Sequence, residues 1–142
     1  MAAGHSVHKC ACKQMRMTAR AVTQFYDRHF LPAGLPAAQF GLLVDISAHP
    51  QISIGELAEL ALMDQTTVTR NVETLRKKGY VQVKPDEADS RKKSVSLSAD
   101  GQTKLEEAMP LWDEAQAAVE REIGVERLKD FFEVLSKLQR II

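Results

Sequence analysis

The sequence predicts a mainly α-helical protein that carries one small β-hairpin. Three observations predict this fold class. Apolar residues recur at spacings of three and four over most of the 142 residues, as on one face of a helix. Near the middle of the chain, two short helical segments are separated by a tight turn, which is the pattern of a helix-turn-helix. Directly after them the period changes to two, as it does in strands.

The first two helices are predicted over residues 9–31 and 36–48. The apolar stripe of the first consists of Val22, Phe25, Tyr26, His29 and Phe30. Pro32, Gly34 and Pro36 then break the helical pattern. The second helix is expected to bury Phe40, Leu43, Val44 and Ser47. It ends at His49, because a residue before proline is pushed out of the helical region.

The helix-turn-helix carries its own start and stop signals. Ser53 and Glu56 have the spacing of a capping box, which predicts a short helix from this point. Leu62-Met63 form the turn, and Asp64 is the N-cap of the next helix. Val68, Val72 and Leu75 are its predicted buried stripe, and Gly79 ends it as a C′ glycine.

The hairpin and two further helices complete the chain. Residues 80–83 and 93–97 alternate as strands and form the wing, joined by a polar turn at 85–90. Ser98 to Gly101 open a long helix that runs to about Gly124, and a last helix follows. Their apolar residues are Leu105, Met109, Trp112, Ala115 and Val119, and then Val125, Leu128, Phe131, Phe132, Leu135, Leu138 and Ile142.

The apolar faces of the first and last helices lack an obvious partner within the chain, so we expect a second copy to cover them. This expectation divides one compact domain into three parts. Residues 1–35 are an N-terminal dimerisation helix, 36–98 a winged helix-turn-helix region, and 99–142 the C-terminal dimerisation helices of a homodimer.

The charge distribution favours one nucleic-acid face. The net charge of the chain is zero, but residues 64–97 hold eight basic and five acidic side chains, a net charge of +3. Residues 98–142 hold six basic and ten acidic side chains, a net charge of −4. We find no stretch of 18 apolar residues and no signal peptide, which predicts a cytoplasmic protein without a membrane partner. The sequence has no recognisable catalytic motif and calls for no cofactor, so we expect no enzyme activity.

Two segments carry a family resemblance. Residues 89–101, Asp-Ser-Arg-Lys-Lys-Ser-Val-Ser-Leu-Ser-Ala-Asp-Gly, are similar to the wing signature of the multiple-antibiotic-resistance-regulator (MarR) family. Residues 60–81 resemble the recognition helix of that family and the strand after it. Lys92 departs from the small hydroxyl residue that usually follows the wing arginine. The resemblance implies a homodimeric transcription regulator, and we expect a repressor that binds a pseudo-palindromic double-stranded DNA operator.

Such a helix enters the major groove by its N-terminal residues, and a wing reaches the neighbouring minor groove or backbone. Arg91 is the expected minor-groove residue, Asp89 holds it in position, and Lys92 and Lys93 contact phosphate. The residues expected to contact bases are Gln65, Thr66, Thr67, Thr69 and Arg70. Arg76, Lys77 and Lys78 are more typical of a solvated face. The alternative function is a protein-interaction adaptor that uses the winged fold without DNA.

Cys10 and Cys12 bear on the signal that regulates DNA binding. Their position resembles that of the reactive cysteine in the organic-hydroperoxide-sensing branch of the family, in which tyrosines support the thiolate, and Tyr26 occupies a matching position. A helix N-terminus, together with Lys9 and Lys13, favours the thiolate form. We expect Cys12 to be the more reactive thiol and Cys10 a resolving thiol or a bystander. Three alternatives stay open: simply packed cysteines, a small aromatic effector, and a metal site formed with His5 and His8.

Overall fold

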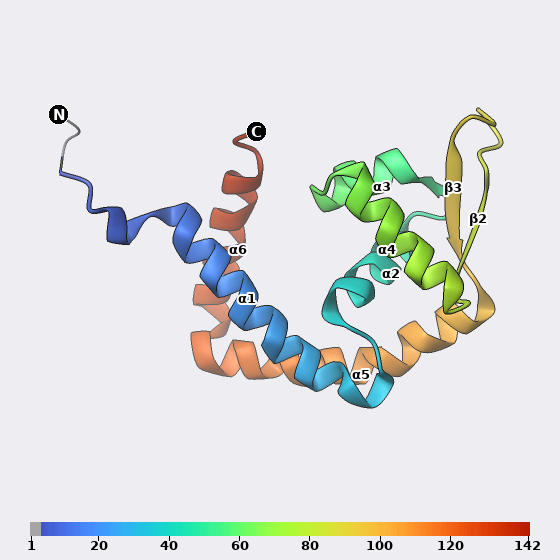
Figure 1. Ribbon diagram of the computed structural model, residues 1–142. Helices are drawn as coiled ribbons and strands as arrows, with labels where there is room; N and C mark the ends of the chain where they lie inside the picture. The colour runs from blue at the N-terminus through green and yellow to red at the C-terminus, as the bar shows by residue number, and fades with distance from the viewer. Residues whose placement is uncertain (1–3) are drawn as a thin grey trace.

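The computed structural model describes residues 4–142 and confirms the mainly helical class (Figure 1). Residues 1–3 of the predicted N-terminal segment lie outside the described residues. The elements are η1 (Val7–Lys9), α1 (Ala11–Phe30), η2 (Leu31–Ala33), α2 (Ala37–Ala48), β1 (Ile52–Ser53), α3 (Ile54–Ala61), α4 (Gln65–Lys77), β2 (Val81–Pro85), β3 (Lys93–Leu97), α5 (Ala99–Ile123) and α6 (Val125–Gln139).

Helix α5 runs along the base of the molecule and joins two parts (Figure 1). At its N-terminal end lie α2, α3, α4 and the sheet, which we call the winged unit (residues 36–98). At its C-terminal end lie α1 and α6, which we call the helical arms. The two parts stand side by side on α5, so the polypeptide has the outline of an open U.

The winged unit contains a three-stranded antiparallel sheet in the order β1-β3-β2. The predicted hairpin is confirmed, with Val83 opposite Val95 and Val81 opposite Leu97. Strand β1 adds a third strand that the sequence analysis did not predict, and its Ile52 pairs with Val95. Val95 is therefore held from both sides, and it is fully buried.

The predicted helix boundaries of the helix-turn-helix are confirmed by their caps. The Ser53 hydroxyl accepts a hydrogen bond from the Glu56 N–H at 3.1 Å, which begins α3. The Asp64 carboxylate does the same for the Thr67 N–H at 2.9 Å, which begins α4. Gly79 has a φ of +82°, the left-handed conformation that a C′ glycine adopts with least strain, and α4 ends there.

The core of the winged unit corrects one predicted helix face. Helix α2 buries Phe40 and Leu43 as expected, but its other buried residues are Leu42 and Ile46. Val44 is 38% exposed and Ser47 is exposed, so their assignment to the inner face was wrong. The reason is that α2 lies between α5 and β3 and packs on both. These two neighbours set the buried side of α2, which includes Leu42 and Ile46 and leaves Val44 and Ser47 on the solvent side.

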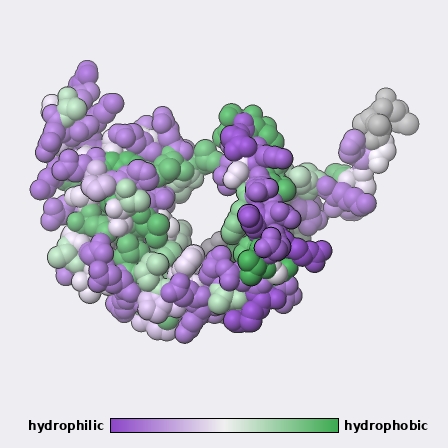
Figure 2. Space-filling view, turned by 180° about the vertical axis from the view of Figure 1, so that it is seen from behind, coloured by the Kyte–Doolittle hydropathy of each residue, from purple (hydrophilic) through white to green (hydrophobic). Residues whose placement is uncertain are grey.

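The helical arms leave much of their apolar surface open. In α6 only Leu128 is buried, and Phe131 and Phe132 are 45% and 50% exposed. Figure 2 shows the hydrophobic surface that results at the tip of this arm, where the exposed chain end of residues 141–142 lies. Helix α1 does find a partner within the chain, contrary to expectation, because its second half packs on α5.

The sequence predicts no helix that spans a membrane. Among residues 4–142 no single helix is long and apolar enough to cross a membrane. One bent pair, residues 11–33 with 37–48 at an angle of 76°, passes the same test of length and composition.

Candidate nucleic-acid interface

The N-terminal half of α4 presents a continuous polar face to solvent. Gln65, Thr66, Thr69 and Arg70 are exposed and line one shallow surface of this helix. Val68, on the opposite face, is fully buried. Burial of the apolar stripe therefore fixes the rotation of α4 and turns four of the five predicted base-contacting residues outward.

The fifth residue, Thr67, is differently placed. It is half-buried, and its hydroxyl donates a hydrogen bond of 2.7 Å to the same Asp64 carboxylate that accepts its N–H. These two hydrogen bonds lower the pKa of Asp64 below its ordinary value. Since the hydroxyl proton is already used in the cap, Thr67 can offer DNA only an acceptor.

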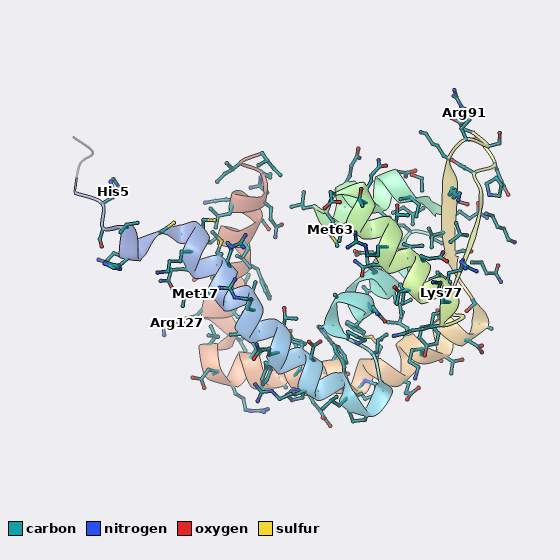
Figure 3. All side chains as sticks on the ribbon, viewed as in Figure 1. His5, Met17, Met63, Lys77, Arg91 and Arg127 are labelled. Carbon is teal, nitrogen blue, oxygen red and sulfur yellow. The ribbon has the colours of Figure 1, made fainter. Side chains whose placement is uncertain are left out.

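The wing tip presents a single outstretched cation. Arg91 projects from the free end of the hairpin, away from the body of the protein (Figure 3), and its side chain is 88% exposed. Asp89 accepts hydrogen bonds from the Arg91 Nε at 3.0 Å and from an Nη at 3.1 Å. The Arg91 hydrogen bonds hold the pKa of the Asp89 carboxyl below its usual range. The predicted pairing of the two residues is thus present in the free protein.

The two predicted sets of residues meet at one groove. A hollow of about 600 Å³ lies between α4, the first turn of α3 and the wing. Gln65 and Thr69 line it from α4, and Arg91, Lys92 and Lys93 line it from the wing. The fold therefore brings Gln65 and Thr69 to one groove with residues 91–93, although the rest of α4, strand β2 and the wing loop separate them in the sequence.

Acidic residues in this surface were missed by the sequence analysis. Glu73 of α4 lines the groove and binds Arg76 through two hydrogen bonds, the shorter of 2.6 Å. This contact lowers the pKa of Glu73. The signal was available, because residues three apart on a helix lie side by side. Arg76 is thereby paired within the helix, and Lys78 donates to the Gln39 side chain at 2.7 Å.

Comparison with known proteins decides the family. The MarR family model matches residues 33–92, which span most of the winged unit. A crystal structure of the M. tuberculosis transcriptional regulator MosR in complex with DNA is 37% identical to this chain. The match covers 92% of this chain and 96% of MosR, with a TM-score of 0.81.

The chain belongs to the MarR family. It is a DNA-binding transcription regulator with a winged helix-turn-helix.

Two further relatives are more distant. The transcriptional repressor YetL of Bacillus subtilis is 29% identical over 120 residues, which cover 78% of this chain and 71% of YetL. The matched segments span between 55% and 71% of the length of the curated relatives. The structure of BpsR from Bordetella bronchiseptica, a protein whose DNA binding is regulated by 6-hydroxynicotinic acid, is 21% identical. It covers 97% of this chain and 99% of BpsR at a TM-score of 0.86, a likeness of fold.

The two thiols of this MarR-family chain lie at the start of α1. Cys10 is the N-cap of the helix, with extended backbone, and Cys12 is the second helical residue. Both thiols are free and exposed. Because Cys10 lies outside the helix, the rule that side chains two apart on a helix point away from each other does not apply to this pair.

Tyr26 does not lie near these thiols within one chain. Fourteen residues of helix separate it from Cys12, or about 21 Å at 1.5 Å per residue. Its hydroxyl instead donates a 2.7 Å hydrogen bond to Gln116 of α5. Burial, and then the charge of Glu120, raise the pKa of Tyr26, so the phenol is neutral. The structure thus assigns Tyr26 a place in the contact of α1 with α5.

The metal alternative gains no geometric support. No group of three or more potential metal-binding side chains comes together anywhere in residues 4–142, and this stretch includes His5, His8 and both cysteines.

Proposed function

We propose that this protein is a homodimeric repressor that holds a pseudo-palindromic operator with its two winged units. The observation that carries the proposal is the groove at which Gln65 and Thr69 of α4 meet Arg91 of the wing. A helix face of amides and hydroxyls suits base edges in the major groove, and an extended arginine suits the minor groove beside it. The name of the related YetL, a repressor, supports the direction of regulation.

The dimer is proposed from the helical arms. Phe131 and Phe132 are about half exposed in the single chain, and Met17 and Val22 of α1 are 47% and 43% exposed. Figure 3 shows Met17 on the N-terminal half of α1. A second copy that packs on these arms removes this surface from water and sets the distance between the two copies of α4. Half-sites about one helical turn apart fit such a pair. We assign the protein to the cytoplasm, where its DNA lies.

We propose oxidation at Cys12 as the releasing signal. The Cys12 thiolate attacks a peroxide, the O–O bond breaks, a sulfenic acid forms and the alcohol leaves. The Cys10 thiol then displaces this oxygen as water, and an S–S bond joins the two residues. The extended backbone at Cys10 and the exposure of both sulfurs support this step. A bridge here changes the start of α1, which belongs to the proposed dimer interface.

The test uses an operator selected from random DNA sequence by the reduced protein. Peroxide is then titrated against operator binding by the wild type, Cys12→Ser and Cys10→Ser. We expect release of the wild type, no release of Cys12→Ser, and release of Cys10→Ser only at higher peroxide if Cys10 resolves the sulfenic acid. Release that persists in Cys12→Ser, or a wild type that stays bound, contradicts the oxidation step while leaving the DNA-binding role intact.

A small aromatic ligand is the second candidate signal. A hollow of about 300 Å³ at the end of α1 is lined by Phe30, Leu31, Leu35 and Pro36, with Asp27 at its side. The regulation of BpsR by 6-hydroxynicotinic acid supports this candidate at the level of a shared fold. In the same assay, release by 6-hydroxynicotinic acid without peroxide favours it, and release by peroxide alone excludes it as the required signal.

A further inference from the structure

The winged unit is joined to α5 by a tightly fitted corner. Ser98 caps α5 by accepting the Gly101 N–H at 3.0 Å, and its own N–H donates to the Tyr80 carbonyl at 3.0 Å. Gly101 is buried against that carbonyl so closely that a Cβ in its place would overlap the Tyr80 oxygen. The first turn of α5 therefore moves together with the strand that follows the recognition helix.

Lys104, one turn further along α5, ties this corner to the link between α1 and α2. Its ammonium group donates to the Ala33 carbonyl at 2.9 Å and lies 3.1 Å from a Glu107 oxygen. It also lies 5.9 Å from the centre of the Tyr80 ring, within reach of a cation–π contact. The side chain is only 19% exposed, which distinguishes it from a solvated surface lysine.

The same link is held from α1 as well. The Asp27 carboxylate accepts the Ala37 N–H at 2.7 Å, across the link, at the first residue of α2. The link of residues 31–36 is thus held by a charged group of α5 at Ala33 and by a charged group of α1 at Ala37, directly after it. Both helices reach the arms, and both contacts face the winged unit.

We infer that Lys104 is a positioning residue, which couples the arms to the winged unit and thereby sets the separation of the two recognition helices in the dimer. The inference rests on the proposed function. The hydrogen bond to Glu107 raises the pKa of Lys104, so the clamp keeps its charge at neutral pH. Without it, residues 31–36 lose a contact to α5, and α1 gains freedom to shift relative to the winged unit, which stays fixed to the first turn of α5. Loss of the Lys104 contact should therefore change the preference for the spacing of the two half-sites and leave the contacts with bases unchanged.

The experiment measures operator affinity with the two half-sites at the natural spacing and with one base pair added or removed. Lys104→Met removes the charge and keeps the length of the side chain. We expect it to bind the natural spacing about tenfold more weakly than the wild type, a coupling of ordinary size for two linked sites. We also expect it to discriminate less between the three spacings. Lys104→Arg, which keeps a donor, should restore the discrimination. Thr103→Met places the same side chain at the neighbouring exposed residue of α5 and should behave as the wild type.

Thermal unfolding separates the clamp from a general loss of fold. If Lys104→Met is not folded at the assay temperature, Lys104→Gln replaces it. A folded variant with the spacing preference of the wild type overturns the inference. A wild type that selects no operator, or that binds as a monomer, contradicts the proposed function itself and is recognised before any variant is made.

Discussion

Val72 of α4 is 2% exposed, whereas Phe132 of α6 is 50% exposed. Both residues lie on the apolar face of an amphipathic helix. The winged unit buries its face within 60 or so residues of chain, because α2, the sheet and α5 close around it. The helical arms have no such layer in the single chain.

The two regions show that an apolar helix face can have two different roles. In the winged unit, the apolar residues form a core that a single chain completes. In the arms, the apolar residues stay exposed in the single chain, and contiguous exposed apolar surface of this kind supports the proposed contact with a second copy. On the proposed function, the winged unit is a DNA-facing part that one chain completes, and the helical arms are an assembly part that a second copy completes. The two parts are joined by the corner at Gly101 and the clamp at Lys104.

Gly101→Ala should destabilise the winged unit, and it has the largest expected effect. The added Cβ would overlap the Tyr80 carbonyl, so α5 must shift away from the sheet. We expect a loss of about 3 kcal/mol in the free energy of unfolding, measured by urea denaturation. Gly41→Ala is the matched control, because its Cβ meets nothing within 4 Å and it lies inside α2. It should stabilise by roughly 0.5–1 kcal/mol. Equal effects at the two glycines would show that the corner is not tightly fitted.

Phe132→Asp should weaken the proposed dimer contact of the helical arms. Half of this side chain remains to be buried, so we expect a loss of about 1 to 2 kcal/mol of dimer stability per copy. Size-exclusion chromatography at falling concentration should show the variant dissociating first. Leu60→Asp, at a residue of the winged unit that is 47% exposed, is the control and should leave dissociation unchanged. Dissociation caused equally by both substitutions would remove the distinction between the two regions.

Arg91→Ala sharpens the comparison within the DNA-facing part. Loss of an extended wing arginine should weaken operator binding about tenfold without changing the melting temperature. Asp89→Ala should act in the same direction and more mildly, by freeing Arg91. Arg76→Ala serves as the control, because this arginine lies in the last turn of α4 and does not line the groove between α4 and the wing. Fluorescence anisotropy with labelled operator at fixed salt measures all three, and wild-type affinity for Arg91→Ala would contradict the role of the wing.

The Asp64 cap should give the smallest effect and one that depends on pH. Hydrogen bonds from Thr67 lower the pKa of Asp64 in the folded protein. Its contribution to stability is therefore present above the unfolded pKa, near 3.9, and is lost as the pH falls through the lower folded pKa. Asp64→Ala should be less stable than the wild type in urea denaturation at pH 7, and the gap should close toward pH 3. Asp64→Asn keeps an acceptor and should stay close to the wild type at pH 7. A gap that is constant with pH would show that the carboxylate charge has no part in the cap.

Local signals explain why so much of the winged unit could be predicted. Ser53, Asp64 and Gly79 act on neighbours within four residues, so their roles can be read from the sequence alone. Strand β1 escaped prediction because it is two residues long and is stabilised by β3, some forty residues away. Val44 was misplaced for a similar reason, since only the fold decides that α2 is covered on two sides.

The candidate site shows the same limit. The residues Gln65, Thr69 and Arg91 could be named from motifs, and the structure brings them to one groove. The Thr67 hydroxyl is used in the N-cap of α4. This depends on a side-chain hydrogen bond, which the spacing of residues in the sequence does not specify. Lys104 carries no motif at all, because its partner is a backbone carbonyl 71 residues away in the chain.

Sedimentation equilibrium of the wild-type protein at micromolar concentration tests the central comparison most directly. The account predicts a mass about twice the 15.8 kDa of one chain, because the arms are completed by a second copy. Circular dichroism on the same sample establishes that the chain is folded. A folded monomer at that concentration would contradict the account, since its exposed arms would then be stable without the partner that their sequence pattern requires.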